Sequence, residues 1–475
     1  MLQNGFEPEF SPQVQQELEQ LKTRSPQVVP TAKVRDLRNL PWSSIDNDSS
    51  RDLDQVEVAE RLPNGEAKIL VGIADVDAFA PKSTAIDKHA ATETTTVYAG
   101  VVNFPMLPEQ LSTDMSSLGQ AQDKLAIVVE FVVGSDGSVH SGTVYRAILC
   151  NKAQLTYNAV GAWLEDRQSA PDKVAASAEL QAQLKLQDEI AQRLMNARYR
   201  HGALNIETIE VTPVLSNGAV SDLLKQEKNR ATELIEDFMI AANEVVARML
   251  QASNVSSIRR VVKSPERWNR IVELAAKQGE QLPAAPDSKA LNDFLIKRKA
   301  ADPDHFTDLS LTIIKLMGPG EYVFERPGDP EQGHFGLAVQ DYTHSTAPNR
   351  RFADLVTQRL VKAVLANQPA PYSDDELAAI AQNCTSKEDA ARKVEREMSK
   401  RLAAVAMSRR IGETFAAIVT GVTPHGTFVR VLEPAVEGLL AQGQQGVDVG
   451  DKLRVKLTRT DIERGYIDFA RDQAV

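Results

Sequence analysis

Cysteine, long apolar runs and excess positive charge are all scarce in this chain of 475 residues, and each shortage narrows its class. The two cysteines, Cys150 and Cys384, are too far apart for a metal-binding spacing and suit a reducing compartment. No window approaches about 18 consecutive apolar residues, so a membrane-spanning helix is not expected. The net charge of −11 disfavours indiscriminate binding to nucleic acid, although a local basic channel remains compatible with it.

The start of the chain also lacks a targeting signal. Residues 1–20 are polar and acidic, without the apolar segment of a secretory signal peptide. The overall composition, 42% hydrophobic and 25% charged, is that of a globular protein long enough for two or three domains. We therefore expect a cytoplasmic monomer without membrane attachment, and the sequence identifies no protein partner.

Turn residues and apolar periodicity divide the chain into three regions. Residues 1–33 hold a short polar helix and a linker, residues 34–410 begin with strands and continue mainly as helices, and residues 411–475 return to strands. Strands are predicted at 56–59, 67–73, 125–133 and 139–149, and helices at 11–21, 174–197, 230–253, 265–278, 287–298, 351–366 and 373–410. The last helix is basic in its second half, and both a solvated face and an RNA-facing role remain open for it.

The C-terminal region is predicted to form a small closed barrel. Five short strands fall within about sixty residues. Their order resembles an S1-type RNA-binding domain, through G-x-F-V at 426–429, V-E-G-L at 436–439 and G-D-x-L-x-V-K at 450–456. The resemblance implies an OB barrel in which Phe428 contacts RNA. Because the region has few other aromatic residues for base stacking, we expect it to bind RNA modestly.

The segment 44–57 carries the most unusual chemistry in the sequence. Four aspartates, Asp46, Asp48, Asp52 and Asp54, fall within nine residues. Carboxylates this close repel one another unless cations compensate them, and hard divalent cations prefer oxygen ligands. A calcium-binding EF-hand loop is one alternative, but Arg51 stands where that loop needs glycine and the following residues have a strand pattern.

Several further motifs, taken with the aspartate segment, resemble the catalytic domain of the ribonuclease II / ribonuclease R (RNB) family of exoribonucleases. These motifs occur in the family's order between about residues 34 and 366, and they are S-I-D-x₅-D-x-D at 44–54, G-I-A-D-V at 72–76, V-Y at 97–98 with F-P-M-L-P-E-Q-L-S at 104–112, A-x-L-x-Y at 153–157, L-I-E-D-F-M-I-A-A-N at 234–243, H-F-G-L at 334–337 and T-A-P-N-R-R-F-A-D-L at 346–355.

The resemblance implies a role for particular residues of this chain. Its metal-binding residues are Asp46, Asp52 and Asp54, with Gln55 at the fourth position of the cluster, and the implied cofactor is Mg²⁺ with Mn²⁺ as the alternative. The implied catalytic residues are Asp54, Tyr157, Glu236 and Arg350. The implied RNA-binding residues are Tyr98, Ile206, Arg350 and Phe428. These residue types suit the hydrolysis of a phosphodiester, because cations and an arginine stabilise the charge that develops on its oxygens.

The chain departs from the family pattern at three places. Gln55 stands where the family usually has a further aspartate, which predicts weaker metal binding or a preference for Mn²⁺. Ile206 stands where several members have an aromatic residue, which predicts a weaker grip on short RNA ends. Larger members carry cold-shock domains before the catalytic domain, and residues 1–33 offer no room for them, so we expect weaker affinity for long RNA.

The sequence thus predicts an α+β fold, with a catalytic domain of mixed strands and helices around an RNA channel and a five-stranded C-terminal OB barrel. The implied activity is metal-dependent 3′→5′ hydrolysis of single-stranded RNA to nucleoside 5′-monophosphates. The alternative is an RNB-like RNA-binding protein with little hydrolysis, because Gln55 removes one carboxylate from the cluster.

Overall fold

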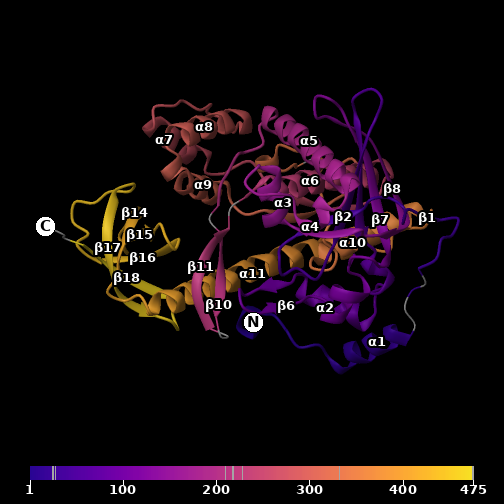
Figure 1. The fold of residues 1–475 in the computed structure, drawn as a ribbon, viewed down its shortest axis with the longest axis horizontal. Coiled ribbons are helices and arrows are strands. Elements are labelled where there is room, and N and C mark those ends of the chain that lie inside the picture. The colour runs from indigo at the N-terminus through magenta and orange to yellow at the C-terminus, as the bar shows by residue number, and fades with distance from the viewer. Residues whose placement is uncertain are drawn as a thin grey trace.

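The computed structural model describes residues 1–23, 26, 28–208, 210–216, 219–226, 228–330 and 332–472. It consists of a large α+β body and a small barrel, joined by one long helix, as Figure 1 shows. The helices are α1 Pro12–Thr23, α2 Ala85–Glu93, α3 Tyr157–Leu164, α4 Asp172–Ala175, α5 Ala178–Arg200, α6 Arg230–Ala252, α7 Trp268–Lys277, α8 Ser288–Ala301, α9 Pro303–Met317, α10 Phe352–Leu365 and α11 Asp374–Ser408. Short helical turns occur at Leu2–Asn4, Val76–Ala78, Leu111–Met115 and Phe335–Leu337.

The body is organised on a seven-stranded sheet with the order β1-β8-β7-β4-β3-β2-β9. Its strands are β1 Val34–Asp36, β2 Ser43–Asp46, β3 Gln55–Arg61, β4 Ala67–Ala74, β7 Asp123–Val133, β8 Val139–Cys150 and β9 Ala153–Thr156. The neighbouring pairs between β8 and β2 are antiparallel, whereas β1 pairs with β8 and β2 with β9 in parallel. The β3–β4 hairpin closes at Gly65, whose φ of +83° favours glycine.

Alternating apolar side chains of this sheet form the main core with α3, α5, α6 and α10. Three two-stranded antiparallel sheets lie outside the seven-stranded sheet, β5 Val97–Tyr98 with β6 Asn103–Phe104, β10 Glu210–Ser216 with β11 Ala219–Gln226, and β12 Ser257–Val261 with β13 Glu321–Glu325. Helices α7, α8 and α9 enclose a separate apolar cluster around Phe294 and Phe306. The seven-stranded sheet therefore has its own core, separate from that of the α7–α9 unit.

Helix α11 links the body to the barrel. It begins at a capping box in which Ser373 accepts from the Glu376 N–H and Glu376 accepts from the Ser373 N–H. Its first half buries Leu377 and Cys384 in the main core, and its last turns bury Leu402 and Met407 against the barrel. One helix thus belongs to both cores, which positions the barrel relative to the sheet (Figure 1).

The barrel closes in the order β14-β15-β16-β18-β17. Its strands are β14 Thr414–Thr423, β15 Gly426–Val431, β16 Val436–Gln442, β17 Lys452–Asp461 and β18 Tyr466–Arg471. Two contacts hold the barrel to α9: Arg430 pairs with Asp308, and His305 Nε2 lies 3.0 Å from the Gly450 carbonyl. The predicted five-stranded barrel is confirmed.

Several predicted helices differ from those observed. The helix expected over 174–197 is two helices, because Ser177 has an extended backbone and caps α5 through the Leu180 N–H. The helix expected from residue 265 begins at Trp268 instead. Helix α9 was not predicted, although Asp302 caps it and Pro303 occupies its first turn, where proline is tolerated. Among the described residues, no helix is long and apolar enough to cross a bilayer.

Candidate active site

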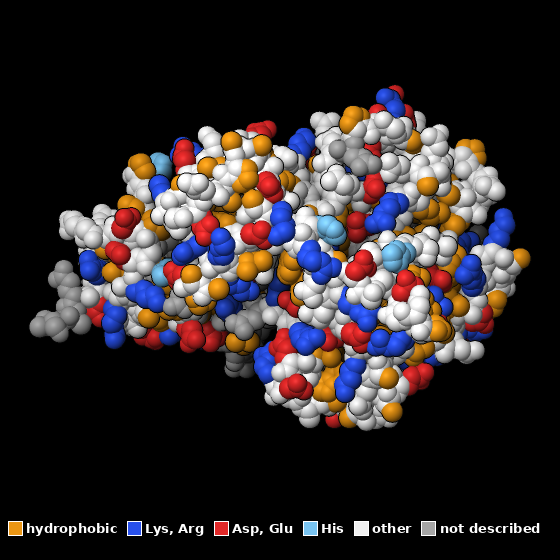
Figure 2. All heavy atoms as spheres, turned by 90° about the horizontal axis from the view of Figure 1, so that it is seen from above, with side chains coloured by type: hydrophobic (Ala, Val, Ile, Leu, Met, Phe, Trp, Pro, Cys, Tyr) orange, Lys and Arg blue, Asp and Glu red, His pale blue; other side chains and the backbone are white. Residues whose placement is uncertain are grey.

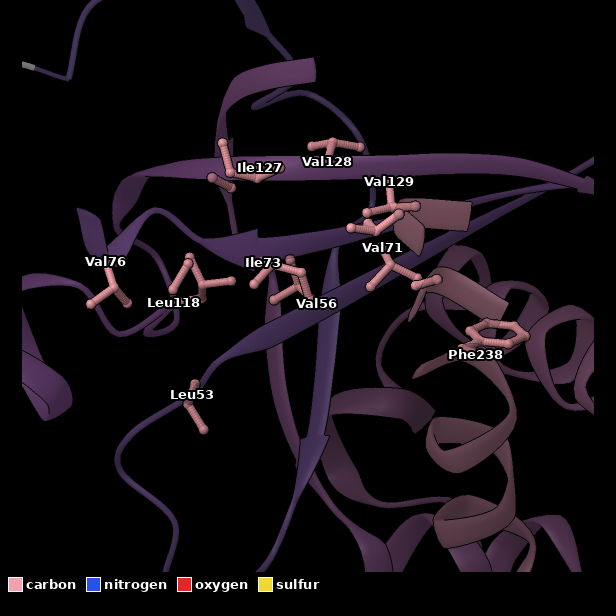
Figure 3. Close-up of a cluster of buried hydrophobic side chains, with 14 of the residues drawn as sticks. Leu53, Val56, Val71, Ile73, Val76, Leu118, Ile127, Val128, Val129 and Phe238 are labelled. Atoms are coloured by element: carbon pink, nitrogen blue, oxygen red, sulfur yellow. The ribbon is translucent and has the colours of Figure 1, made fainter. Parts of the chain in front are cut away.

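A buried leucine fixes the aspartate segment to the main core. Leu53 is 1% exposed and packs into the apolar cluster of Figure 3, which includes Ile73 and Leu118. Its N–H donates to Ser117 Oγ at 3.0 Å, and its carbonyl accepts from the Leu118 N–H at 2.9 Å. Because Leu53 points into the core, its neighbours Asp52 and Asp54 are held at fixed positions beside it. Strands β2 and β3 flank this segment, so it has no EF-hand architecture.

Asp46 and Asp54 are buried acids at the site. Asp46 ends β2 and is 9% exposed, whereas Asp54 precedes β3 and is 2% exposed. Burial raises the pKa of Asp46 to about 6, against the Gln55 hydrogen bond and the positive charge of Arg350. Burial also raises the pKa of Asp54 to about 7, again against the charge of Arg350. One oxygen of each, Oδ2, has no hydrogen-bond partner within the described chain.

Arg350 and Tyr98 come to Asp54 from distant parts of the sequence. Arg350 Nε lies 3.6 Å from Asp54 Oδ2, and the Arg350 side chain is 46% exposed. Burial raises the pKa of the Tyr98 hydroxyl and the charge of Arg350 opposes this rise, and Tyr98 is 40% exposed. The Asn349 N–H donates to Asp54 Oδ1 at 3.0 Å, and the Thr96 N–H donates to the Arg350 carbonyl at 3.0 Å. A guanidinium and an aromatic ring thus lie at the surface directly above a buried carboxylate.

Tyr157 lies within the electrostatic influence of Asp46 and Arg350. It begins α3, directly after Thr156, which is paired with Asp46 across the parallel β2–β9 ladder. Burial raises the pKa of Tyr157, and the charges of Asp46 and Glu57 raise it further. The phenol therefore stays protonated at neutral pH and is able to donate a hydrogen bond.

Gln55 and Glu57 are the first and third residues of β3. Gln55 Nε2 donates to Asp46 Oδ1 at 3.1 Å, and this hydrogen bond stabilises the charged form of the aspartate. Glu57 is completely buried, which raises its pKa, the charge of Asp46 raises that pKa further, and Glu57 raises the pKa of Tyr157. Glu57 was not among the predicted site residues, although residues 55 and 57 lie on the same face of a strand.

The family resemblance implies a divalent cation at Asp46, Asp52 and Asp54. Within the described ranges, no three acidic, histidine or cysteine side chains converge closely enough to enclose a metal ion. However, Mg²⁺ usually keeps several waters and binds through one or two carboxylates plus substrate phosphates. The buried, unpartnered Oδ2 atoms of Asp46 and Asp54, with Asp52 beside them, fit that mode of binding.

These buried aspartates predict a pH-dependent stability. Their pKa values are raised on folding, so the native state holds protons that the unfolded state releases, and the free energy of unfolding should fall as the pH rises from about 4 to about 7. At about 1.4 kcal/mol for each tenfold change in proton affinity, Asp54 alone accounts for a fall on the order of 4 kcal/mol. Urea denaturation in EDTA measures this, and Asp54→Asn should flatten the profile. A wild-type profile that rises over this pH range would contradict the burial of free carboxylates.

Ile206 and Glu236 lie in a different hollow from Asp54. Both line a cavity of about 400 Å³ together with Tyr199, Lys225 and Lys299. Glu236 pairs with Lys228 at 2.8 Å, and both side chains are partly exposed. Ile206 packs against the α7–α9 cluster and presents no ring to this cavity. The two residues thus share one mixed-charge cavity between α6 and the α8–α9 unit.

Phe428 belongs to the barrel. It lies half-buried on β15, paired with Gly421 and Leu439, while His425 in the preceding turn is exposed. Figure 2 shows Lys and Arg interspersed with Asp and Glu over one face of the molecule. Charge on that face is therefore mixed, and RNA contacts would depend on local groups such as Arg350.

Comparison with known proteins places this geometry in a family. The profile described as the RNB domain matches residues 34–367, and the profile described as the RNase II-type exonuclease C-terminal S1 domain matches residues 413–472. The chain therefore belongs to the RNB family, which confirms both the predicted resemblance and the predicted fold class. Residues 368–412, which include all of α11, lie outside both matches.

Individual relatives agree with this assignment. The chain is 30% identical to Ribonuclease R of Thermotoga maritima over 472 residues, which cover 92% of this chain and 64% of that protein. It is 30% identical to Ribonuclease R 1 of Lactococcus lactis over 465 residues, which cover 91% of this chain and 56% of that protein. The chain thus spans about 56–64% of the length of these curated relatives.

Two solved structures share the fold. RNase R of Mycoplasma genitalium in complex with ribose-methylated single-stranded RNA superposes with a TM-score of 0.85 at 23% identity, covering 99% of this chain and 77% of that one. Yeast Ssd1, described as a pseudonuclease, superposes with a TM-score of 0.68 at 19% identity, covering 86% of this chain and 51% of that one. At these identities the likeness concerns the fold alone.

Proposed function

We propose that this protein is a metal-dependent 3′→5′ exoribonuclease that hydrolyses single-stranded RNA to nucleoside 5′-monophosphates. The observation that carries the proposal is the buried Asp54 carboxylate, 2% exposed, with an unpartnered oxygen and a half-exposed Arg350 at 3.6 Å. An acid buried beside an accessible guanidinium suits a substrate that is an anion and a cofactor that is a cation. RNA and Mg²⁺, or Mn²⁺ in its place, meet both requirements.

Asp46 and Asp54, assisted by Asp52, would hold the cation, which supplies an activated water and charge stabilisation at the phosphate. Arg350 would donate to a non-bridging phosphate oxygen, and a charge-assisted bond of this kind is stronger in a site from which water is excluded. The Asn349 N–H keeps Asp54 in place through Oδ1, and Oδ2 has no hydrogen bond among the described residues. Tyr157, protonated at neutral pH, would donate a hydrogen bond to the scissile phosphate.

Tyr98 supports the choice of a single strand. Its ring is 40% exposed and its hydroxyl lies within the electrostatic influence of Arg350, so a base stacked on the ring would place its phosphate near the guanidinium. Stacking requires an unpaired base, which favours single-stranded RNA. Glu236, Ile206 and Phe428 would contact nucleotides further along the strand.

The same proposal extends to the organisation of the chain. We assign residues 1–33 to an N-terminal segment, residues 34–410 to the catalytic domain with α11, and residues 411–475 to the RNA-binding barrel. The protein would act as a monomer in the cytoplasm. Sedimentation equilibrium of the full chain tests the monomer, which a concentration-dependent mass would contradict.

An RNA-binding protein with little hydrolysis is the second candidate. It is favoured by the Gln55 amide, which occupies Asp46 Oδ1 and adds no charge to the cluster. The two candidates differ in what they do to 5′-labelled single-stranded RNA with Mg²⁺ or Mn²⁺, with Asp54→Asn as the control. A ladder that shortens to a small limit product, absent with the control, supports the nuclease. Intact RNA with a retained gel shift supports the binder.

Ile206 provides a test of how short RNA ends are held. Replacing it with phenylalanine should add a stacking surface worth about 1–3 kcal/mol, and therefore slow the dissociation of short RNA by roughly fivefold to a hundredfold. Dissociation of labelled pentanucleotides from a hydrolysis-deficient background measures this. Ile296→Phe is the matched control, since Ile296 is 44% exposed on α8. Equal rates for the Ile206 variant and its parent would remove Ile206 from the RNA path.

A further inference from the structure

Glu57 is the most anomalous side chain in the central sheet. It lies within β3, is 0% exposed, and neither carboxylate oxygen has a hydrogen-bond partner among the described residues. Burial of a carboxyl group without partners is costly, and native proteins retain such groups only rarely. The backbone of Glu57 is ordinary, because it pairs with Val71 of β4 and with Ser43 of β2. The anomaly is therefore confined to the side chain.

The other buried acids of the described chain lie within 4 Å of a cationic side chain. Glu57 and Asp46 do not, and Asp54 has only Arg350 at 3.6 Å. The acids with such partners are Asp75, Asp87, Glu93, Asp188, Asp237, Glu325 and Asp354. The protein thus compensates buried acids with its own cations everywhere in the described ranges except at one place. The buried acids that lack a cationic side chain within 4 Å therefore lie at the aspartate cluster.

The direction of Glu57 is set by the strand. Residues 55 and 57 are alternate residues of β3 and lie on the same face of the sheet. Gln55 reaches Asp46 from this face. Burial and the charge of Asp46 raise the pKa of Glu57, and Glu57 in turn raises the pKa of Tyr157. Glu57 is therefore an unpartnered, buried group beside the proposed cation site, on the same strand as the neutral Gln55.

We propose that Glu57 accepts hydrogen bonds from cation-bound water. Its carboxylate thereby gives the cation site the negative charge that the neutral Gln55 lacks. Because no three acidic side chains converge in the described ranges, an indirect contact through water suits the observed arrangement. Mg²⁺ keeps several of its waters in proteins, and carboxylates around a metal commonly orient such ligands. The inference rests on the metal dependence put forward above, and it adds a residue to that site.

Mn²⁺ binding to the full-length protein, followed by electron paramagnetic resonance of free Mn²⁺, tests the proposal without relying on activity. Glu57→Gln keeps the shape of the side chain and removes its charge. We expect it to weaken Mn²⁺ binding about 10- to 100-fold, the usual effect of losing a group that orients metal ligands. In EDTA its urea midpoint should equal or exceed that of the wild type, because an unpartnered acid has been neutralised.

Two further variants test whether the change in Mn²⁺ affinity is specific to Glu57. Gln55→Asp combined with Glu57→Gln should restore Mn²⁺ affinity to within about threefold of wild type, since the cluster regains one carboxylate. Glu130→Gln is the matched control, because Glu130 lies in the same sheet and bonds Tyr145 at 2.7 Å, and it should leave affinity unchanged.

Wild-type affinity in Glu57→Gln, failure of the double variant to recover, or equal weakening in the control would each overturn the role of Glu57. If wild-type protein bound no Mn²⁺ at all, the metal dependence itself would fail, and the role of Glu57 with it.

Discussion

Asp54→Asn is expected to reduce RNA hydrolysis by at least about a thousandfold while leaving RNA binding intact. The substitution keeps the shape of the side chain but removes the buried charge that would hold the cation, and a loss of about 4 kcal/mol of transition-state stabilisation corresponds to this factor. RNA binding should persist because Arg350 and Tyr98 remain exposed at 46% and 40%. Single-turnover hydrolysis and filter binding on the same RNA separate the two effects.

Asp48→Asn is the matched control for this result. Asp48 belongs to the same segment, but its side chain is exposed and accepts a bond from Asn158 at 2.7 Å. Its loss should change the hydrolysis rate by less than about twofold, since solvent-exposed changes away from a site are usually small in effect. Comparable losses in both variants would mean that the general acidity of the segment matters, and not the buried position of Asp54.

Arg350→Gln should lower the single-turnover rate by about 10²- to 10³-fold, the range seen when one preorganised donor to a developing oxyanion is removed. Since the Arg350 guanidinium is half-exposed and lies 3.6 Å from Asp54, beyond hydrogen-bond distance, the free energy of unfolding should change by less than about 1 kcal/mol. Hydrolysis rates and urea denaturation of the same preparation measure both quantities.

The neighbouring arginine is expected to behave differently. Arg351 donates to both oxygens of Asp354, at 2.7 and 2.8 Å, and Asp354 is fully buried. Arg351→Gln therefore leaves a buried acid without its cation, and should lower the free energy of unfolding by about 3–5 kcal/mol. An Arg350 variant that lost stability in this way, with an unchanged rate per folded molecule, would make Arg350 a structural residue.

The sequence predicted those parts of the structure that depend on local pattern. Alternating apolar residues identified the β7–β8 hairpin and the barrel strands, and helix periodicity identified α6, α10 and α11. The sequence did not predict the hairpin β10–β11, whose apolar residues Val220 and Leu223 are buried only because α11 and the barrel cover them. Such strands depend on tertiary contacts that local propensity does not contain.

Most of the predicted site residues form two groups in the structure. The motif order selected Asp46, Asp54, Tyr98, Tyr157 and Arg350, and the structure brings these five together from separate segments. Their roles in catalysis stay predictions. Ile206 and Glu236 lie together in a second cavity.

What the sequence analysis missed at this site was the environment of Gln55. The motif placed Gln55 as the fourth residue of the metal cluster, and in the structure its amide nitrogen donates to Asp46 Oδ1. Glu57 was missed because a glutamate in a strand ordinarily faces solvent, and only the folded sheet reveals that this one is buried.

We expect the Asp54–Arg350 group to hydrolyse RNA from its 3′ end with an activated water. Mass spectrometry of the first products released from a single-stranded RNA of defined sequence, in Mg²⁺ or Mn²⁺, tests this most directly. The account predicts nucleoside 5′-monophosphates in the order of the sequence read from the 3′ end, with the 5′ end of the RNA intact. Nucleoside 3′-monophosphates, 2′,3′-cyclic phosphates, or release beginning at the 5′ end would contradict it.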